Sequence, residues 1–257
     1  MEEARRKHAG LKIALTKNLG FHDKLIDITI QRIEEFTGEK TSASSGQALC
    51  QHPIEKESFR IIGTELDESA FPPLELPVVK RVIHTTADFE FKDILKFTTG
   101  AVEAGVRAIR EGRSIITDVR MVEAGIMKYR LEPFGAKTFC FSSDKSVADM
   151  ASAQGTTKTA ASMRKAAEIM EGGIVAIGNA PTALSELLRI IASGGPRPAL
   201  IIGVPVGFVG AVEAKEELEK SGLTAIYTKG RKGGSTIAVA IVNALAILAA
   251  EAHTGLK

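Results

Sequence analysis

Tryptophan is absent from the 257 residues, and the chain has only two tyrosines and two cysteines. So few large aromatic rings leave few platforms on which nucleic-acid bases could stack. Charge is nearly balanced, with 33 Lys and Arg against 31 Asp and Glu and a net charge of +2. The two signs are interspersed along the chain. The basic footprint of a nucleic-acid-binding protein is therefore missing, and we expect no nucleic-acid partner.

The two cysteines, Cys50 and Cys140, lie far apart and fit neither a disulfide framework nor a zinc site. His52 lies two residues from Cys50, but no second pair is near, and structural zinc takes four ligands. We therefore expect no metal held by the protein. Such sparse use of cysteine is typical of a reducing compartment, which predicts a cytoplasmic protein.

Long apolar segments and the common catalytic motifs are also missing. The longest uncharged apolar stretches, residues 198–212 and 237–250, are too short to span a bilayer. The N-terminus lacks the apolar core of a secretory signal, and we expect no membrane partner. Neither the P-loop spacing, nor the dinucleotide spacing GxGxxG, nor a GxSxG nucleophile elbow occurs. A nucleotide-dependent enzyme is one alternative, which stabilisation by NAD or ATP would support.

What the chain does contain is an alternation of short apolar runs with amphipathic stretches. The runs cover residues 114–117, 138–141, 174–177, 199–203 and 225–228. Runs that are apolar throughout and separated by a helix-length crossover indicate parallel strands buried on both faces. The pattern predicts an α/β fold with a parallel, doubly wound sheet of about five strands and helices on both faces.

Glycine-rich loops follow three of these runs, at residues 178–184, 203–218 and 229–236, and each leads into an expected helix. In doubly wound sheets, ligands bind beyond the carboxyl ends of the strands. Glycines let the backbone approach a ligand closely, and a helix N-terminus offers unpaired N–H groups to an anion. Asn179 and Thr182 could add side-chain hydrogen bonds. The alternative is that these glycines serve turn geometry alone.

The first 53 residues differ from the rest. Isoleucines recur at helical spacing within residues 21–36, and Gly38 stands where a glycine would end that helix. Residues 39–53 are small, polar and turn-forming, which is typical of a linker. We therefore expect an N-terminal helical arm with a linker over residues 1–53, and a main domain over residues 54–257.

His84 is the histidine best placed for chemistry. It follows an apolar helical stripe formed by Val78, Val79, Val82 and Ile83, and it opens a polar stretch. Histidine gives and takes protons near neutral pH more readily than other side chains. A purely structural histidine is the alternative.

Cationic candidates for binding carboxylates are Lys158, Arg231 with Lys232, and Arg120. The alternative is that these cations are ordinary surface residues exposed to solvent, as most Lys and Arg are. A cation beside a glycine-rich loop at a strand end is better placed to meet a carboxylate than one elsewhere.

Six blocks of the sequence strongly resemble the precorrin-8X methylmutase family, the precorrin isomerases of cobalamin biosynthesis. The blocks are ESFRII (57–62), VKRVIHTTADFEF (79–91), ITDVRMVEAGI (116–126), AIGNAPTAL (176–184), GVPVGFVGAVEAKEEL (203–218) and GRKGGSTIAVAIVNAL (230–245). The likeness is collinear over about residues 54–250. It implies a parallel α/β sheet and an obligate homodimer that binds a tetrapyrrole, the corrinoid substrate, at the subunit interface.

The resemblance also implies a reaction. A methyl group moves from carbon 11 to carbon 12, which converts precorrin-8X to hydrogenobyrinate, or the cobalt form to cobyrinate. No organic cofactor is used, and cobalt, where present, is carried by the substrate. The family's catalytic histidine falls on His84, and the serine of its SF motif falls on Ser58, a ligand contact.

The predicted substrate-binding residues come from the glycine-rich loops and from the six blocks that resemble the family, together with the cationic candidate Lys158. They are Ser58, Thr85, Lys158, Asn179, Thr182, Gly207, Phe208, Gly210, Arg231, Gly233, Gly234 and Ser235. Lys158 departs from the family, whose members usually carry an arginine there, so a forked carboxylate contact becomes a point charge.

Two questions stay open at this stage. A corrinoid carrier that binds the product without catalysis is the alternative to an isomerase, and turnover that is lost in a His84→Ala variant separates the two. The N-terminal 50 residues lie outside the methylmutase pattern and faintly resemble the closing segment of small sirohydrochlorin cobalt chelatases. They represent either a remnant of a fused chelatase or an unrelated arm that stabilises a dimer.

Overall fold

The computed structural model describes residues 53–254. The chain divides into two units, Met1–His52 and Pro53–Lys257. The predicted helix over residues 21–36, and the predicted linker except for its last residue, lie outside the described residues. The expected role of the first 53 residues therefore stays a prediction.

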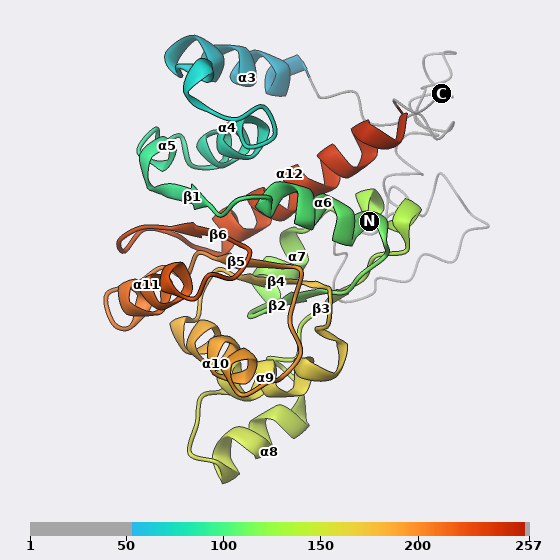
Figure 1. The fold of residues 1–257 in the computed structure, drawn as a ribbon, viewed down its shortest axis with the longest axis vertical. Coiled ribbons are helices and arrows are strands. Elements are labelled where there is room, and N and C mark those ends of the chain that lie inside the picture. The colour runs from blue at the N-terminus through green and yellow to red at the C-terminus, as the bar shows by residue number, and fades with distance from the viewer. Residues whose placement is uncertain (1–52, 255–257) are drawn as a thin grey trace, which may run out of the picture. The chain divides into compact units, whose positions relative to one another are not determined.

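A six-stranded sheet forms the centre of the main unit (Figure 1). Its strands are β1 (Leu95–Phe97), β2 (Ile115–Thr117), β3 (Thr138–Phe139), β4 (Ile174–Ile177), β5 (Leu200–Gly203) and β6 (Ala225–Thr228), in the order β1-β6-β5-β4-β2-β3. Strands β2 to β6 pair in parallel. They are the five predicted strands, and every residue of β2, β4, β5 and β6 is buried because helices cover both faces.

The strand β1 was not predicted, and it makes the sheet mixed rather than wholly parallel. It runs antiparallel to β6, with Leu95 opposite Thr228 and Phe97 opposite Ile226. Only three residues long, it includes Lys96 and follows a short helix directly. An edge strand pairs on one side only, and this one is short and contains a charged residue. It therefore lacks the continuous apolar pattern that marks the buried strands.

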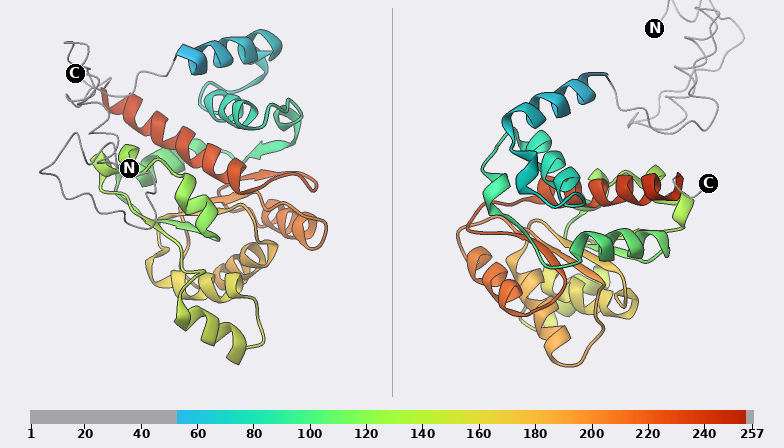
Figure 2. Two further views of the ribbon diagram at one scale, coloured as in Figure 1. Left: turned by 180° about the vertical axis from the view of Figure 1, so that it is seen from behind. Right: turned by 45° about the horizontal axis from the view of Figure 1, so that its top comes forward.

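Helices form a layer on each face of the sheet (Figures 1 and 2). They are α3 (Pro53–Glu65), α4 (Leu76–Thr86), α5 (Phe91–Ile94), α6 (Ala101–Arg110), α7 (Arg120–Gly125), α8 (Lys145–Ala153), α9 (Lys158–Ala166), α10 (Pro181–Ala192), α11 (Ala211–Lys220) and α12 (Ser235–Thr254), with 3-10 turns at Glu68–Ala70, Lys128–Arg130, Glu132–Phe134 and Ala167–Ile169. Helices α6, α7 and α12 lie on one face, and α9, α10 and α11 lie on the other. The prediction of a doubly wound fold is confirmed.

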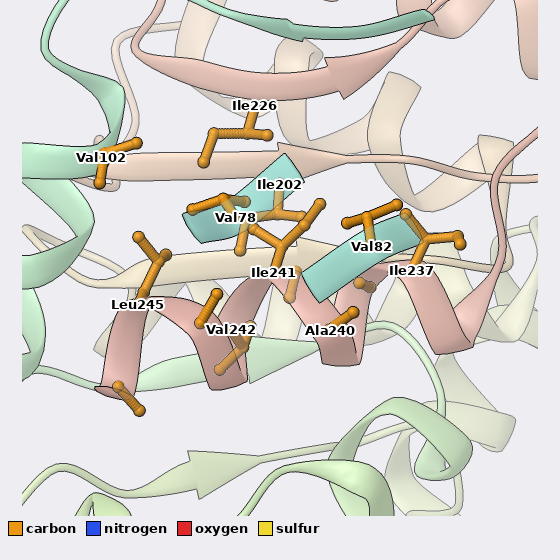
Figure 3. Packing of buried hydrophobic residues seen from close by; sticks show 14 of the residues in the cluster. Val78, Val82, Val102, Ile202, Ile226, Ile237, Ala240, Ile241, Val242 and Leu245 are labelled. Atoms are coloured by element: carbon orange, nitrogen blue, oxygen red, sulfur yellow. The ribbon is translucent and has the colours of Figure 1, made fainter. Parts of the chain in front are cut away.

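The larger hydrophobic core lies around α12, which packs on the sheet and on α4 (Figure 3). Ile237, Ile241 and Leu245 recur at helical spacing and share one cluster with side chains from β5, β6 and α4. Because α12 lies between the sheet and α4, it is apolar on more than one side. No helix within residues 53–254 is both long and apolar enough to cross a membrane.

Candidate active site

The three glycine-rich loops meet at the carboxyl end of the sheet, as the parallel strand order requires. The N–H of Gly207 donates to the carbonyl of Arg231 at 3.2 Å, and the N–H of Gly234 donates to the carbonyl of Val204 at 2.9 Å. Gly178 approaches the third loop so closely that a Cβ atom here would lie 2.7 Å from the Cα of Ser235. The backbone packing thus requires glycine at position 178.

Asp118 holds the first of these loops, and its role was not predicted from the sequence. It follows β2 directly, and its carboxylate is fully buried. Oδ1 accepts the N–H of Gly178 at 3.2 Å, and Oδ2 accepts the N–H groups of Asn179 and Ala180 at 2.8 Å each. Burial raises the pKa of Asp118, and the three N–H donors act in the opposite direction. Asp118 therefore caps the start of α10 from a neighbouring strand.

This arrangement corrects one expectation about the loops. Their backbone N–H groups were predicted to be available to an anionic ligand. Those of Gly178, Asn179 and Ala180 instead donate to Asp118, and those of Gly207 and Gly234 donate to neighbouring loops. These five N–H groups are therefore paired within the protein, which leaves the side chains and the other N–H groups of the loops to contact a ligand.

Several of the predicted side chains lie together on this edge. Thr182, in the first turn of α10, shares hydrogen bonds of 3.0 Å with the hydroxyls of Thr157 and Thr159. Thr157 also accepts the N–H of Ala160 and so caps α9, in which Lys158 is the first residue. Lys158, Thr182 and Asn179 are all exposed. Lys158 and Thr182 are thus neighbours although 24 positions separate them in the sequence.

Phe208 and Arg231 form a second exposed group on two of the loops. The Phe208 side chain is 83% exposed and that of its neighbour Val209 is 89% exposed. The Arg231 guanidinium lies 5.2 Å from the centroid of the Phe208 ring, within cation-π range. Gly210, the next residue along the chain, is the N-cap of α11. The exposed ring provides an apolar surface, and the exposed guanidinium beside it can bind a carboxylate.

The last loop leads directly into α12. Gly233 and Gly234 precede Ser235, the first residue of that helix. A Cβ atom at Gly233 would clash with the carbonyl oxygen of Val204, so only glycine fits there. Ser235 is buried. Gly233, Gly234 and Ser235 therefore determine the conformation of this loop through its internal packing.

His84 lies near the end of α4, and the stripe of Val78, Val79, Val82 and Ile83 that precedes it is buried as predicted. Its half-buried imidazole stacks on Phe59 of α3, with ring centroids 5.0 Å apart and an interplanar angle of 16°. Stacking of this kind restricts how the imidazole can turn.

Groups around Phe59 complete this contact between α3 and α4. The Arg81 guanidinium lies 4.6 Å from the Phe59 ring centroid and also binds the carboxylate of Glu55. Two predicted ligand contacts use their hydroxyls within their own helices: Ser58 donates to the carbonyl of Ile54 at 3.0 Å, and Thr85 donates to the carbonyl of Arg81 at 2.9 Å.

An ion pair connects the end of α4 to the loop that precedes α12. The Lys232 ammonium lies 2.6 Å from Oδ2 of Asp88 and 2.7 Å from Oε2 of Glu90. Asp88 is four residues beyond His84. Arg120 lies elsewhere, exposed and paired with Glu123 and Ser143. Among residues 53–254 no group of three or more His, Cys, Asp or Glu side chains is arranged to hold a metal ion.

A sequence model of precorrin-8X methylmutases matches residues 53–248. The chain belongs to the precorrin-8X methylmutase family. The resemblance in the six sequence blocks is thereby confirmed, and so is the predicted enzyme class, because a methylmutase is an isomerase.

Individual members of the precorrin-8X methylmutase family agree with this assignment. The cobalt-precorrin-8 methylmutase of Priestia megaterium is 48% identical over 196 residues, which cover 76% of this chain and 87% of the relative. The precorrin-8X methylmutase of Pseudomonas aeruginosa is 40% identical over 195 residues, covering 75% of this chain and 93% of the relative. A solved structure of a Thermus thermophilus precorrin-8X methylmutase is similar with a TM-score of 0.72 and 46% identity, covering 77% of this chain and 96% of that one.

Three residues that hold parts of the candidate site were not predicted from the sequence: Asp118, Phe59 and Lys215. The Nζ of Lys215 donates to the hydroxyl of Thr228 and to the carbonyl of Lys232. Asp118 follows a predicted strand, so the strand-end rule that identified the glycine loops could have found it. Lys215 has the same helical spacing as Ala211 and Leu218, which are buried, so the pattern could have placed it on the apolar face of α11. No signal in the sequence pairs Phe59 with His84.

Proposed function

We propose that this chain moves a methyl group from carbon 11 to carbon 12 of precorrin-8X, or of cobalt-precorrin-8, to give hydrogenobyrinate or cobyrinate in cobalamin biosynthesis. The observation that carries the proposal is the family match over residues 53–248, which includes His84 in its block VKRVIHTTADFEF. The names of the relatives favour this isomerase over a corrinoid carrier that does not catalyse.

His84 is the proposed catalytic residue. A methyl shift within one conjugated system requires no nucleophile, only a macrocycle that is made electron-poor and held in shape. A protonated His84 that donates to a ring nitrogen would draw electrons toward that nitrogen, and stabilise the charge that develops in the transition state. The stack on Phe59 supports this role because it keeps the imidazole plane in place before the substrate binds.

The remaining predicted residues are proposed to bind the substrate. A corrinoid carries carboxylate side chains around an apolar macrocycle, so it suits the exposed pair of Phe208 and Arg231. Lys158, Asn179 and Thr182 lie exposed on the same edge of the sheet and can contact further carboxylates. We propose that the reaction uses no organic cofactor, and that any cobalt arrives with the substrate.

A homodimer with the active site at the subunit interface is the proposed assembly. Phe208 and Val209 support it, since apolar side chains this exposed are usually covered by a ligand or a partner. Sedimentation velocity tests the assembly: a dimer that dissociates in a Phe208→Asp, Val209→Asp double variant is expected, and a monomeric wild-type protein would contradict it. The cytoplasmic location indicated by the two cysteines stays a prediction.

Two variants of His84 test the reaction itself. Purified protein is given precorrin-8X and its cobalt form in parallel, without added cofactor, and the visible spectrum follows conversion. His84→Phe keeps a ring to stack on Phe59 but has no proton to donate, and His84→Ala removes both. We expect both variants to lose turnover, while corrinoid affinity stays within about tenfold of wild type because many peripheral contacts supply it. Turnover by His84→Phe close to the wild-type rate would contradict the role of His84.

A further inference from the structure

Lys215 is a buried ammonium with no charge partner among the described residues. It lies in α11, on the face that also buries Ala211, Ala214 and Leu218, and it is only 2% exposed. No carboxylate within residues 53–254 lies within 4.0 Å of its nitrogen. Burial lowers the pKa of Lys215 to about 8. An unpaired buried charge costs stability, so the fold gains nothing from this charge as such.

The contacts of Lys215 lie beneath the loop that joins β6 to α12. Its Nζ donates to Oγ1 of Thr228 at 3.2 Å and to the carbonyl oxygen of Lys232 at 3.0 Å. The Thr228 hydroxyl donates to the same carbonyl at 2.8 Å. Thr228 ends β6 and Lys232 lies four residues on, so Lys215 binds both ends of the segment that presents Arg231.

The side chain of Lys232 continues this connection toward His84. While its carbonyl is bound by Lys215, its ammonium reaches Asp88 and Glu90 on the segment that follows α4. The N–H of Asp88 in turn donates to the hydroxyl of Thr86, two residues beyond His84. A continuous series of contacts therefore runs from Lys215 through Lys232 to the end of the helix that carries the proposed catalytic residue.

We propose that Lys215 is a positioning residue for the methyl shift. By holding the carbonyl of Lys232 inward, it sets the shape of the loop that carries Arg231, and through the Lys232 ammonium it sets the position of the α4 end with His84. This role rests on the proposed function and adds to it a residue that touches no substrate.

Replacement by methionine tests the role. Lys215→Met has similar length, fills the same apolar site and carries no donor. Lys220→Met, at the exposed end of α11, is the matched control. We expect Lys215→Met to melt at or above the wild-type temperature, because the unpaired charge is gone, while kcat falls roughly tenfold to a hundredfold, the scale of a misplaced catalytic group. The control should match wild type in both measurements.

A double-variant cycle tests the route through Lys232. If Lys215 acts on His84 through that side chain, Lys232→Met lowers kcat as well, and the double variant loses no more than the larger single loss. Losses that multiply would overturn the route. A lowered melting temperature in Lys215→Met, with kcat per folded molecule within about twofold of wild type, would show a structural role and overturn the proposal.

Amide hydrogen exchange tests whether Lys215 holds the loop without depending on the proposed function. Faster exchange at residues 229–234 is expected in Lys215→Met and not in Lys220→Met, whatever substrate the protein acts on. If the wild-type protein converts neither corrinoid, the proposed function fails while the exchange still decides whether Lys215 holds the loop. Unchanged exchange in Lys215→Met would overturn the proposal. If Lys215→Met does not fold, Lys215→Leu, which is shorter and also carries no donor, is measured instead with the same expected and contradicting results.

Discussion

Replacing Asp118 should loosen the start of α10, and the geometry sets the size of the effect. In Asp118→Asn, the amide oxygen can keep the two 2.8 Å bonds from Asn179 and Ala180, but its NH2 group then faces the N–H of Gly178, which is a donor too. In Asp118→Ala, all three N–H groups lose their acceptor. The two variants therefore remove one and three hydrogen bonds from the same loop.

The cost follows from the donors left unpaired. One buried donor without a partner costs about 1–3 kcal/mol, so Asp118→Asn should lose about that much stability. Asp118→Ala leaves three such donors and should lose at least about 3 kcal/mol, with water entering the space limiting the loss. For a domain of this size each kcal/mol shifts Tm by about 2–4 °C.

Thermal melts and urea unfolding measure these losses, and Asp149→Asn, an exposed carboxylate on α8, is the matched control. Amide exchange at residues 178–180 should rise in the order wild type, Asn variant, Ala variant. Since Asn179 lies on this loop and Thr182 follows it, corrinoid affinity should weaken in the same order. An Asp118→Asn protein as stable as the Asp149→Asn control would refute the reasoning, because it would mean that the three N–H groups do not depend on the carboxylate.

Three further predictions concern stability, binding and the arm. Arg189 and Arg164 lower the pKa of Glu186 from 4.5 to about 2, so stability present above pH 4.5 should be lost as the pH falls toward 2, by about 3 kcal/mol. Urea midpoints at several pH values measure this, and a Glu186→Gln variant with the same acid response would contradict it. Lys158→Ala should weaken corrinoid affinity by about 1–3 kcal/mol while Lys158→Arg keeps or tightens it, and equal affinities in a titration would show that Lys158 makes no contact. Deleting residues 1–52 should leave turnover intact, because the family match begins at residue 53, and a folded truncation that lacks turnover would contradict this.

The strands and the His84 helix were predictable because their patterns are local. Runs such as residues 174–177 are apolar at every position because they are buried on both faces, and the stripe before His84 follows from the 3.6-residue period of a helix. The strand β1 was missed because three residues on a sheet edge carry no such pattern. The loops were located correctly, but the prediction did not foresee that five of their N–H groups bond within the protein.

The sequence by itself determined the five parallel strands, their alternation with helices, the three loops at one edge and the resemblance to the family. Only the tertiary structure decided which groups hold that edge together. Asp118 binds a loop some 60 positions away, because β2 lies beside β4 in the sheet. Lys215 meets Lys232 because α11 packs beside β6, and Phe59 meets His84 because α3 packs on α4. Periodicity reports which face of an element is buried, whereas the partner of a buried polar group depends on strand order and helix packing, which bring distant residues together and which no local pattern encodes.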